Sequence, residues 1–259
     1  DGVSVYTAEP NTRLRLTYLE RKINLKPFCT ISDNLLEDFK NCAYFKRYIH
    51  VKEALPEQLP SIRIGKANII NGNSFLALMS LNDNSIDGVV TSPPYYNAKE
   101  YSQWENIYCY LYDMYNISKE LYRIMKPGAV YLFNIFDYFD NENNIVLSAM
   151  GNKRMILGAY MLDIFSRVGF NIVGNIIWNK GEIQGNRSFN QGNMTPYYQA
   201  PLNCWEHIFI LSKEKPAPKY QSLVSEIYSM RPVIKMVRGK NILGHTAPFP
   251  NHIPELLIK

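Results

Sequence analysis

Ser92-Pro93-Pro94-Tyr95 is the stretch whose residue types and spacing are best suited to chemistry. Proline has no backbone N–H and cannot donate to a strand ladder, so the carbonyls of this segment can face a ligand. Ser92 Oγ and the Pro93 carbonyl could accept both N–H groups of an exocyclic amine, which would free the nitrogen lone pair for attack. Tyr95 could stack on the ring that carries the amine. The alternative is a strand-ending Pro-Pro turn with a packed tyrosine.

Short apolar runs that alternate with helical patterns must position this motif. Ile86–Thr91 is rich in β-branched residues and predicts a buried strand that ends at Ser92. An apolar stripe at helical spacing, which runs from Ile107 to Ile124, predicts a helix of about twenty residues that is stopped by Pro127-Gly128. The other expected elements are an apolar run at Ile62–Ile70, short helix Phe75–Leu81, strand Ala129–Phe136, helix Met155–Val168, and strands Asn171–Trp178 and His207–Leu211.

Strands that alternate with crossover helices predict an α/β fold with a mostly parallel sheet covered on both faces. Such sheets bind ligands at the carboxyl ends of their strands, where the Ser92–Tyr95 segment would lie. We expect residues 61–259 to form this catalytic domain. Residues 1–60 are expected to be a separate helical appendage, punctuated by Pro56 and Pro60.

The charge of the 259-residue chain is localised. Lys and Arg number 28 against 23 for Asp and Glu, a formal charge of +5. The segment Lys213–Lys240 carries seven basic and two acidic residues, so it accounts for the whole excess. A localised basic surface suits a polyanion, although a solvated, lysine-rich loop explains it equally well. No apolar stretch reaches the roughly 18–20 residues of a membrane helix, and the four cysteines show no zinc-ligand spacing.

Further segments resemble, in family order, the amino-group DNA methyltransferases, which modify cytosine N4 or adenine N6 with S-adenosylmethionine. The resemblance covers about Ile62 to Lys259 and implies a Rossmann-like fold. Because the Ser-Pro-Pro-Tyr motif precedes the Thr246–Pro250 segment, the order is that of the circularly permuted beta class. The segments are residues 71–74, 81–87 and 91–95, Leu121–Gly128, Ile177–Lys180, Trp205–Ile208 before Ser212-Lys213, Thr246–Pro250 and Ile253–Ile258.

The resemblance also implies a binding site for S-adenosylmethionine. Its residues would be Asn73, Ser74, Thr91, Pro248, Phe249 and Pro250. The family usually has an acid where this chain has Asn73, and a structural turn is the alternative role for that segment. The glycine-rich cofactor strand that follows the Thr246–Pro250 segment in the family is absent before Lys259. We expect a missing C-terminal segment or a second chain to supply it, and a non-catalytic remnant is the alternative.

Double-stranded DNA is the partner that the resemblance implies. A base within a duplex cannot reach such a pocket and must be flipped out. Tyr96, next to the motif, is a candidate to receive it. The expected target-recognition segments are residues 181–203 and 213–243, with a mobile loop and a solvated face as their alternatives. The candidate DNA contacts are Tyr96, Arg187, Arg231, Lys235, Arg238 and Lys240.

These observations predict a cytoplasmic, prokaryotic DNA methyltransferase of a restriction-modification system. Ser92, Pro93, Pro94 and Tyr95 would be its catalytic residues. Serine before Pro-Pro-Tyr favours cytosine N4 over adenine N6 by analogy with the family. The alternatives are adenine N6 methylation, methylation of RNA or of a glutamine amide, and a non-catalytic DNA-binding subunit.

Overall fold

The computed structural model describes the chain from Leu59 onward, with gaps. The predicted appendage, apart from Leu59 and Pro60, and residues 182–204 lie outside the described residues. None of the helices among the described residues is long and apolar enough to cross a membrane. The described residues are 59–96, 104, 107–135, 138–139, 154–155, 157–181, 205–233, 236–237, 240–245, 248 and 250–258.

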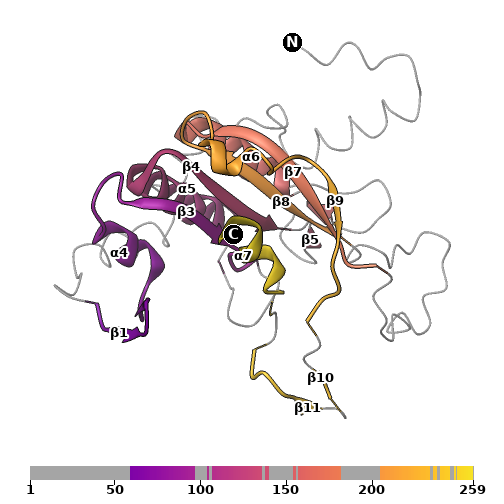
Figure 1. Ribbon diagram of the computed structural model, residues 1–259. Coiled ribbons are helices and arrows are strands. Elements are labelled where there is room, and N and C mark those ends of the chain that lie inside the picture. The colour runs from indigo at the N-terminus through magenta and orange to yellow at the C-terminus, as the bar shows by residue number, and fades with distance from the viewer. Residues whose placement is uncertain are drawn as a thin grey trace, which may run out of the picture.

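A five-stranded sheet forms the centre of the described structure (Figure 1). Its strand order is β3 (Ile86–Thr91), β4 (Met125–Ile135), β8 (Trp205–Ser212), β7 (Asn171–Asn179) and β9 (Ile227–Ser229). β3 pairs with β4 in parallel, β7 pairs with β9 in parallel, and β8 is antiparallel to both neighbours. Four of these five strands therefore run in one direction, and the predicted mostly parallel sheet is confirmed.

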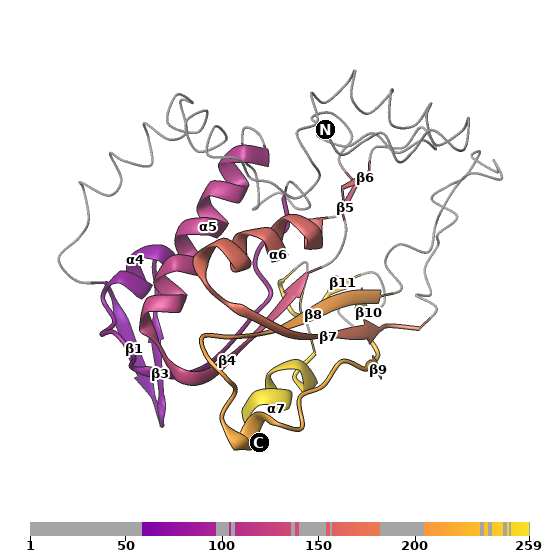
Figure 2. The same ribbon diagram turned by 90° about the horizontal axis from the view of Figure 1, so that it is seen from above.

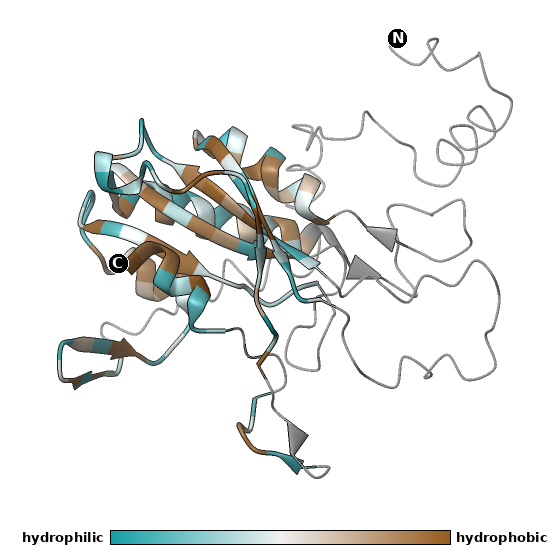
Figure 3. Cartoon of the chain, turned by 45° about the vertical axis from the view of Figure 1, so that its right-hand side comes forward, coloured by the Kyte–Doolittle hydropathy of each residue, from teal (hydrophilic) through white to brown (hydrophobic). Residues whose placement is uncertain are grey.

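Helices α5 (Ile107–Ile124) and α6 (Leu157–Val168) cover one face of the sheet (Figure 2). Alternation along β4 sends Tyr131 and Phe133 to this face, where the Phe133 and Phe165 rings lie edge to face at 4.9 Å. Full burial of such a side chain contributes about 1.5–3 kcal/mol. In Figure 3, apolar residues gather on the strands and on the helix surfaces that face them.

The opposite face is covered by α7 (His252–Ile258) and by the segment after β8, which includes the short helix η4 (Pro218–Tyr220). A Cβ on Gly88 would lie 2.9 Å from Leu257 Cδ2 and 3.2 Å from Tyr220 Oη. Glycine at this position of β3 therefore permits the close approach of α7. Figures 1 and 2 show that α7 runs roughly opposite to β3, so its first residues lie toward the carboxyl end of that strand.

Local sequence signals explain where most elements begin and end. The predicted bounds of β3 are confirmed, and the predicted long helix is α5, which spans the apolar stripe from Ile107 to Ile124. The single apolar run at residues 62–70 is instead the hairpin β1 (Ser61–Ile64) and β2 (Ala67–Ile70), because Gly65 turns the chain with a φ of 58°. The short helix α4 (Ser74–Met79) follows, and the Asn73 side chain caps it. Two further two-stranded pairs are β5 (Tyr138–Phe139) with β6 (Arg154–Met155), and β10 (Met236–Val237) with β11 (Lys240–Asn241).

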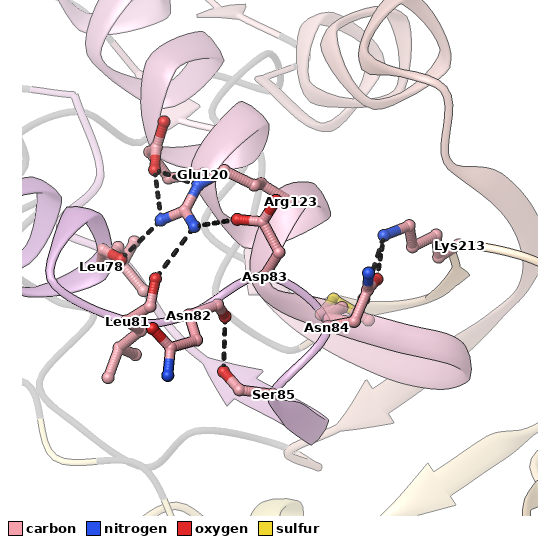
Figure 4. Close-up of polar contacts among 10 residues, drawn as sticks. Leu78, Leu81, Asn82, Asp83, Asn84, Ser85, Glu120, Arg123 and Lys213 are labelled. Atoms are coloured by element: carbon pink, nitrogen blue, oxygen red, sulfur yellow. Dashed lines mark hydrogen bonds and ion pairs between the residues drawn. The ribbon is translucent and has the colours of Figure 1, made fainter.

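Arg123, at the end of α5, holds the connection between α4 and β3 (Figure 4). Its guanidinium donates to the carbonyl oxygens of Leu78 at 3.0 Å and Leu81 at 2.9 Å. It also pairs with Asp83 at 2.5 Å and Glu120 at 2.8 Å. Five N–H donors in a rigid fork suit this set of acceptors from two elements. Arg123 thus fixes the amino end of β3, the strand that carries the Ser92–Tyr95 segment.

Replacing Arg123 with methionine should lower the free energy of unfolding by about 1–2 kcal/mol, because two carbonyls and two carboxylates lose a shared donor. Urea unfolding measures the change. The matched control is Arg167→Met, because Arg167 forms an ion pair with Asp163 within α6, and its loss should lower the free energy of unfolding by only about 0.5 kcal/mol. Equal effects of both substitutions would contradict the anchoring role.

Candidate active site

The carboxyl ends of β3, β4 and β7 and the amino end of β8 meet at one edge of the sheet. Ladder pairing of β3 ends with Thr91 opposite Phe133, and Ser92–Tyr95 follows directly. Asn134 lies opposite Ile208, and Glu206 lies opposite Trp178. Because β8 runs in the reverse direction, its first residues reach the edge at which its neighbours end. The strand order thus brings together residues that are far apart in the sequence.

The hydroxyl of Tyr95 is the centre of the polar contacts at this edge. It donates to Glu206 Oε2 at 2.8 Å, and it lies 3.2 Å from Ser92 Oγ and 3.4 Å from Asn134 Oδ1. Asn134 Nδ2 donates to the carbonyl oxygen of His207 at 3.0 Å, which turns Asn134 Oδ1 toward Tyr95. Three neighbouring strands therefore contribute to one hydrogen-bond network around the tyrosine of the motif.

A buried ion pair supports this network from the next strand. Lys180, directly after β7, pairs with Glu206 Oε1, and the two side chains are only 10% and 9% exposed. The Lys180 ammonium also lies 4.8 Å from the centre of the Trp178 ring. Two charges in such a site are tolerated because each compensates the other and makes further polar contacts. Glu206 thus bonds Lys180 with one oxygen and Tyr95 with the other.

Tyr95 stays protonated over the physiological pH range. Burial raises its pKa well above the usual 10.0, and the adjacent negative charge of Glu206, whose carboxylate also accepts its hydrogen bond, raises it further. A hydrogen bond from Ser92 acts in the opposite direction and is the smaller effect. The Tyr95 hydroxyl is therefore a donor in the folded protein.

This shift of the Tyr95 pKa predicts a loss of stability at high pH. Above about pH 10 the unfolded chain ionises this tyrosine while the folded chain retains the proton, so unfolding releases a proton. Stability due to Tyr95 is present below that pH and should fall by about 1.4 kcal/mol per pH unit above it. Urea unfolding at rising pH should therefore show a steeper decline for the wild type than for Tyr95→Phe. Parallel declines would contradict the prediction.

The predicted catalytic residues occupy a partly open loop. Ser92 and Pro93 are half-buried, and Pro94 is exposed. The carbonyls of these residues lie outside the strand ladder, whose pairing ends at Thr91. Hydroxyl and carbonyl acceptors at the carboxyl edge of a parallel sheet can bind a planar group that carries N–H donors.

The residues predicted to bind a cofactor fall in two places. Asn73 and Ser74 are exposed at the start of α4, where Asn73 Oδ1 accepts a hydrogen bond from the backbone N–H of Phe75 at 3.0 Å. The helix-capping role therefore occupies this oxygen in part. Half-buried Thr91 is at the end of β3, and buried Pro250 directly precedes the start of α7, which packs against that strand. Pro248 is half-buried, and Phe249 lies outside the described residues.

The predicted DNA contacts have different placements. Tyr96 has no exposed surface and packs against Tyr110 in the core, with ring centres 5.9 Å apart, so the prediction of a nucleotide contact is not supported for it. Arg231 is exposed and follows Met230, whose backbone N–H bonds to Asn179 at the edge that carries the site. Lys240 is exposed on β11, which stands apart from the sheet (Figure 1). Arg187, Lys235 and Arg238 lie outside the described residues.

Lys213, the first residue of the predicted basic segment, supports the fold instead. It follows β8 at the edge opposite Ser92, and its ammonium donates to Asn84 Oδ1 at 2.7 Å and to the Met125 carbonyl at 3.1 Å. Figure 4 shows the contact with Asn84 beside the Arg123 anchor. Part of the local positive charge therefore holds the amino end of β3 in place.

Three residues of the network were not predicted as site residues: Glu206, Lys180 and Asn134. A usable signal was present, because a charged residue lies two positions from each of two apolar strand sequences, Ile176–Trp178 and Ile208–Leu211. Charged residues are rarely buried unless they are paired, so two opposite charges at adjoining strand ends indicate an internal pair. The antiparallel direction of β8, which the sequence pattern did not reveal, makes them neighbours.

Comparison with known proteins identifies the family of the chain. Residues 86–259, which include Ser92–Tyr95 and the network around the Tyr95 hydroxyl, match the N6/N4 methyltransferase family described as DNA methylase. The chain belongs to this DNA methylase family. The resemblance to amino-group DNA methyltransferases is thereby confirmed, and S-adenosylmethionine is the methyl donor of the family.

Several individual relatives are similar to the chain. The type II beta methyltransferase M.BslI of Bacillus sp. (strain NEB-606) is 44% identical over 98% of this chain, which spans 30% of the length of that relative. The type II methyltransferase M.MjaI of Methanocaldococcus jannaschii is 24% identical over 69% of this chain and 71% of its own length. The cytosine-N4-specific PvuII DNA methyltransferase shares the fold, with a TM-score of 0.53 and 19% identity over 72% of this chain and 67% of its own.

Proposed function

We propose that this chain carries the amine-methylating site of an S-adenosylmethionine-dependent DNA methyltransferase, and that its target is N4 of cytosine. The observation that supports this most directly is the position of Ser92 and Pro93. Both lie half-buried at the carboxyl edge of the sheet, and Ser92 Oγ is 3.2 Å from the Tyr95 hydroxyl. An acceptor pair at the edge where such sheets bind ligands can orient an incoming amine.

The chain's own residues would bind and orient the target. Ser92 Oγ and the Pro93 carbonyl would accept the two N–H groups of the amine, which directs its lone pair away from the protein. The Tyr95 ring would contact the face of the flipped base while its hydroxyl remains bonded to Glu206. When bound, S-adenosylmethionine supplies an electrophilic methyl group to this nitrogen. Positioning and electrostatics would therefore supply most of the rate.

The residues for cofactor binding remain part of the proposal. Thr91 and Pro250 suit the role, because β3 and the start of α7 are adjacent at the edge that carries Ser92. Asn73 and Ser74 would add polar contacts from α4, with Asn73 Nδ2 as a donor since its oxygen caps the helix. Pro248 would contribute from the segment before α7.

The partner in this proposal is double-stranded DNA with the target base flipped out. Exposed Arg231, next to β9 at the site edge, would contact phosphates, and Lys240 would extend the basic surface on β11. The named relatives are type II methyltransferases, so we also propose a restriction-modification system as the setting.

Chromatography of nucleosides tests both the reaction and the target atom. The full-length protein is incubated with S-adenosylmethionine and unmethylated phage DNA, and the DNA is then digested to nucleosides. N4-methyldeoxycytidine is the expected product. If the product is N6-methyldeoxyadenosine, the target is adenine instead of cytosine, while the proposed methylation of an exocyclic amine still holds. Absence of any methylated nucleoside would overturn the proposed function.

A further inference from the structure

We propose that Glu206, held by Lys180, is a positioning residue that sets the direction of the Tyr95–Ser92 hydrogen bond and thereby turns the Ser92 lone pairs toward the amine. The inference rests on the proposed function, because it specifies how the acceptor in that site is oriented. Glu206 would act through Tyr95, since its contacts are with Tyr95 and Lys180.

The direction of the first bond follows from the chemistry of the three groups. A carboxylate accepts hydrogen bonds and has no proton to donate, and the Tyr95 hydroxyl has a single hydrogen. Among the described residues, Glu206 Oε2 at 2.8 Å and Asn134 Oδ1 at 3.4 Å are acceptors within reach of that hydrogen. The shorter, charge-assisted bond is the stronger one, so the Tyr95 hydrogen points to Glu206.

Asn134 reinforces this direction. Its Nδ2 donates to the His207 carbonyl at 3.0 Å, so the side that it presents to Tyr95 is its oxygen. Asn134 therefore presents Tyr95 with a second acceptor and no competing donor. Since Asn134 is only 1% exposed within β4, its amide is held in this orientation by the strand.

The direction of the second bond is then determined as well. With its hydrogen committed to Glu206, the Tyr95 oxygen can only accept from Ser92, whose Oγ is 3.2 Å away. The Ser92 hydrogen is therefore directed inward, and the remaining lone pairs of Oγ face the open side of the loop. An amine N–H needs an acceptor at that point. If the chain of bonds were reversed, the Ser92 hydrogen would face the amine and compete with its N–H groups.

Lys180 holds Glu206 in the position that this chain of hydrogen bonds requires. It bonds Glu206 Oε1 and leaves Oε2 for Tyr95, and it supplies the opposite charge that a buried carboxylate needs. The raised pKa of Tyr95 keeps the hydroxyl protonated, so its role as a donor does not change across the working pH range.

The substitution Glu206→Gln tests the direction with little change of shape. Glutamine carries an NH₂ that can donate to Tyr95, so the bonds can reverse. We expect kcat for methyl transfer to phage DNA to fall roughly 10- to 100-fold, with the KM values for DNA and S-adenosylmethionine unchanged. Glu120 on α5, which pairs with Arg123 away from the site, provides the matched control, and Glu120→Gln should retain wild-type kcat.

A double-mutant cycle with Tyr95→Phe separates positioning from a structural role. Without the Tyr95 hydroxyl, Glu206 has no path to Ser92, so Glu206→Gln should change kcat less than about threefold in the Tyr95→Phe background. An equal fold-reduction in both backgrounds, or an unchanged kcat in Glu206→Gln alone, would overturn the inference.

The Lys180→Met/Glu206→Gln variant covers the case in which Glu206→Gln alone does not fold. It removes both charges and leaves no buried ion without a partner. It should show the same loss of kcat when Tyr95 is present, and wild-type kcat in this variant would overturn the inference. If the wild type itself transfers no methyl group, the proposed function fails and the inference fails with it. An active wild type with a fully active Glu206→Gln variant removes the inference alone.

Discussion

Replacing Ser92 with alanine (Ser92→Ala) is expected to lower methyl transfer about 100-fold or more while the protein remains folded. Alanine removes the Oγ acceptor that would orient the amine, whereas the structure loses one 3.2 Å contact with Tyr95. Such a single, partly exposed hydrogen bond contributes about 1 kcal/mol to stability. The measurement is incorporation of tritiated methyl groups into unmethylated phage DNA, together with a urea unfolding curve.

The separation of turnover from stability is what makes this result informative. Ser80→Ala is the matched control, because Ser80 is exposed at the end of α4 and its hydroxyl donates to the Ala77 carbonyl of the same helix at 2.7 Å. That variant should keep wild-type turnover. A Ser92→Ala protein with undiminished transfer would show that the amine is oriented by other groups, and the catalytic role of the motif would be rejected.

The sequence alone predicted the strand before this motif and the long helix after it. β3 has two consecutive valines, which favour a strand. It ends shortly before two prolines, which cannot donate to a strand ladder, so the end of the strand could be predicted as well. α5 has a stripe of apolar residues at helical spacing over five turns, and it ends where Pro127 and Gly128 approach. These signals come from residues close together in the sequence, and such residues largely determine where a strand or helix begins and ends.

Contacts between distant segments could not be predicted in the same way. β8 is buried on both faces from Ile208 to Ser212, and an apolar run of this kind does not reveal the direction of the strand. The direction of β8 determines whether Glu206 lies at the edge of the sheet that carries Ser92 or at the opposite edge, which carries Lys213. The order of residue types along the chain therefore predicted where the motif lies, but it did not predict which distant residues contact the motif.

Tyr95 and Tyr96 show the same limit within one dipeptide. Tyr95 ends the motif and Tyr96 follows it, and both were predicted to contact the target base. Their side chains leave the backbone in different directions, so the Tyr95 hydroxyl reaches Glu206 while Tyr96 enters the core beside Tyr110. Only the path of the chain after Pro94 distinguishes them.

The largest effect on stability is expected for Lys180→Met. Methionine retains most of the apolar stem but leaves Glu206 as a buried charge without its cation, because the two side chains are 10% and 9% exposed. Loss of one partner from such a pair typically costs about 3–5 kcal/mol, a large fraction of the stability of a typical domain. Urea unfolding of the full-length protein should show this loss as a large drop in the transition midpoint.

Two further variants establish that the cause is the orphaned charge and not the loss of a lysine. Lys126→Met breaks an ion pair with Asp87 whose side chains are 44% and 66% exposed, and it should leave unfolding nearly unchanged. Adding Glu206→Gln to Lys180→Met should recover much of the lost stability, since the second change removes the charge that the first one orphans. Recovery of stability without recovery of kcat would separate the two functions of the pair: Lys180 neutralises Glu206, and Glu206 directs Tyr95. If the double variant were as unstable as Lys180→Met, the contact of the Lys180 side chain with Trp178 would account for the loss of stability, and the unpaired charge of Glu206 would not.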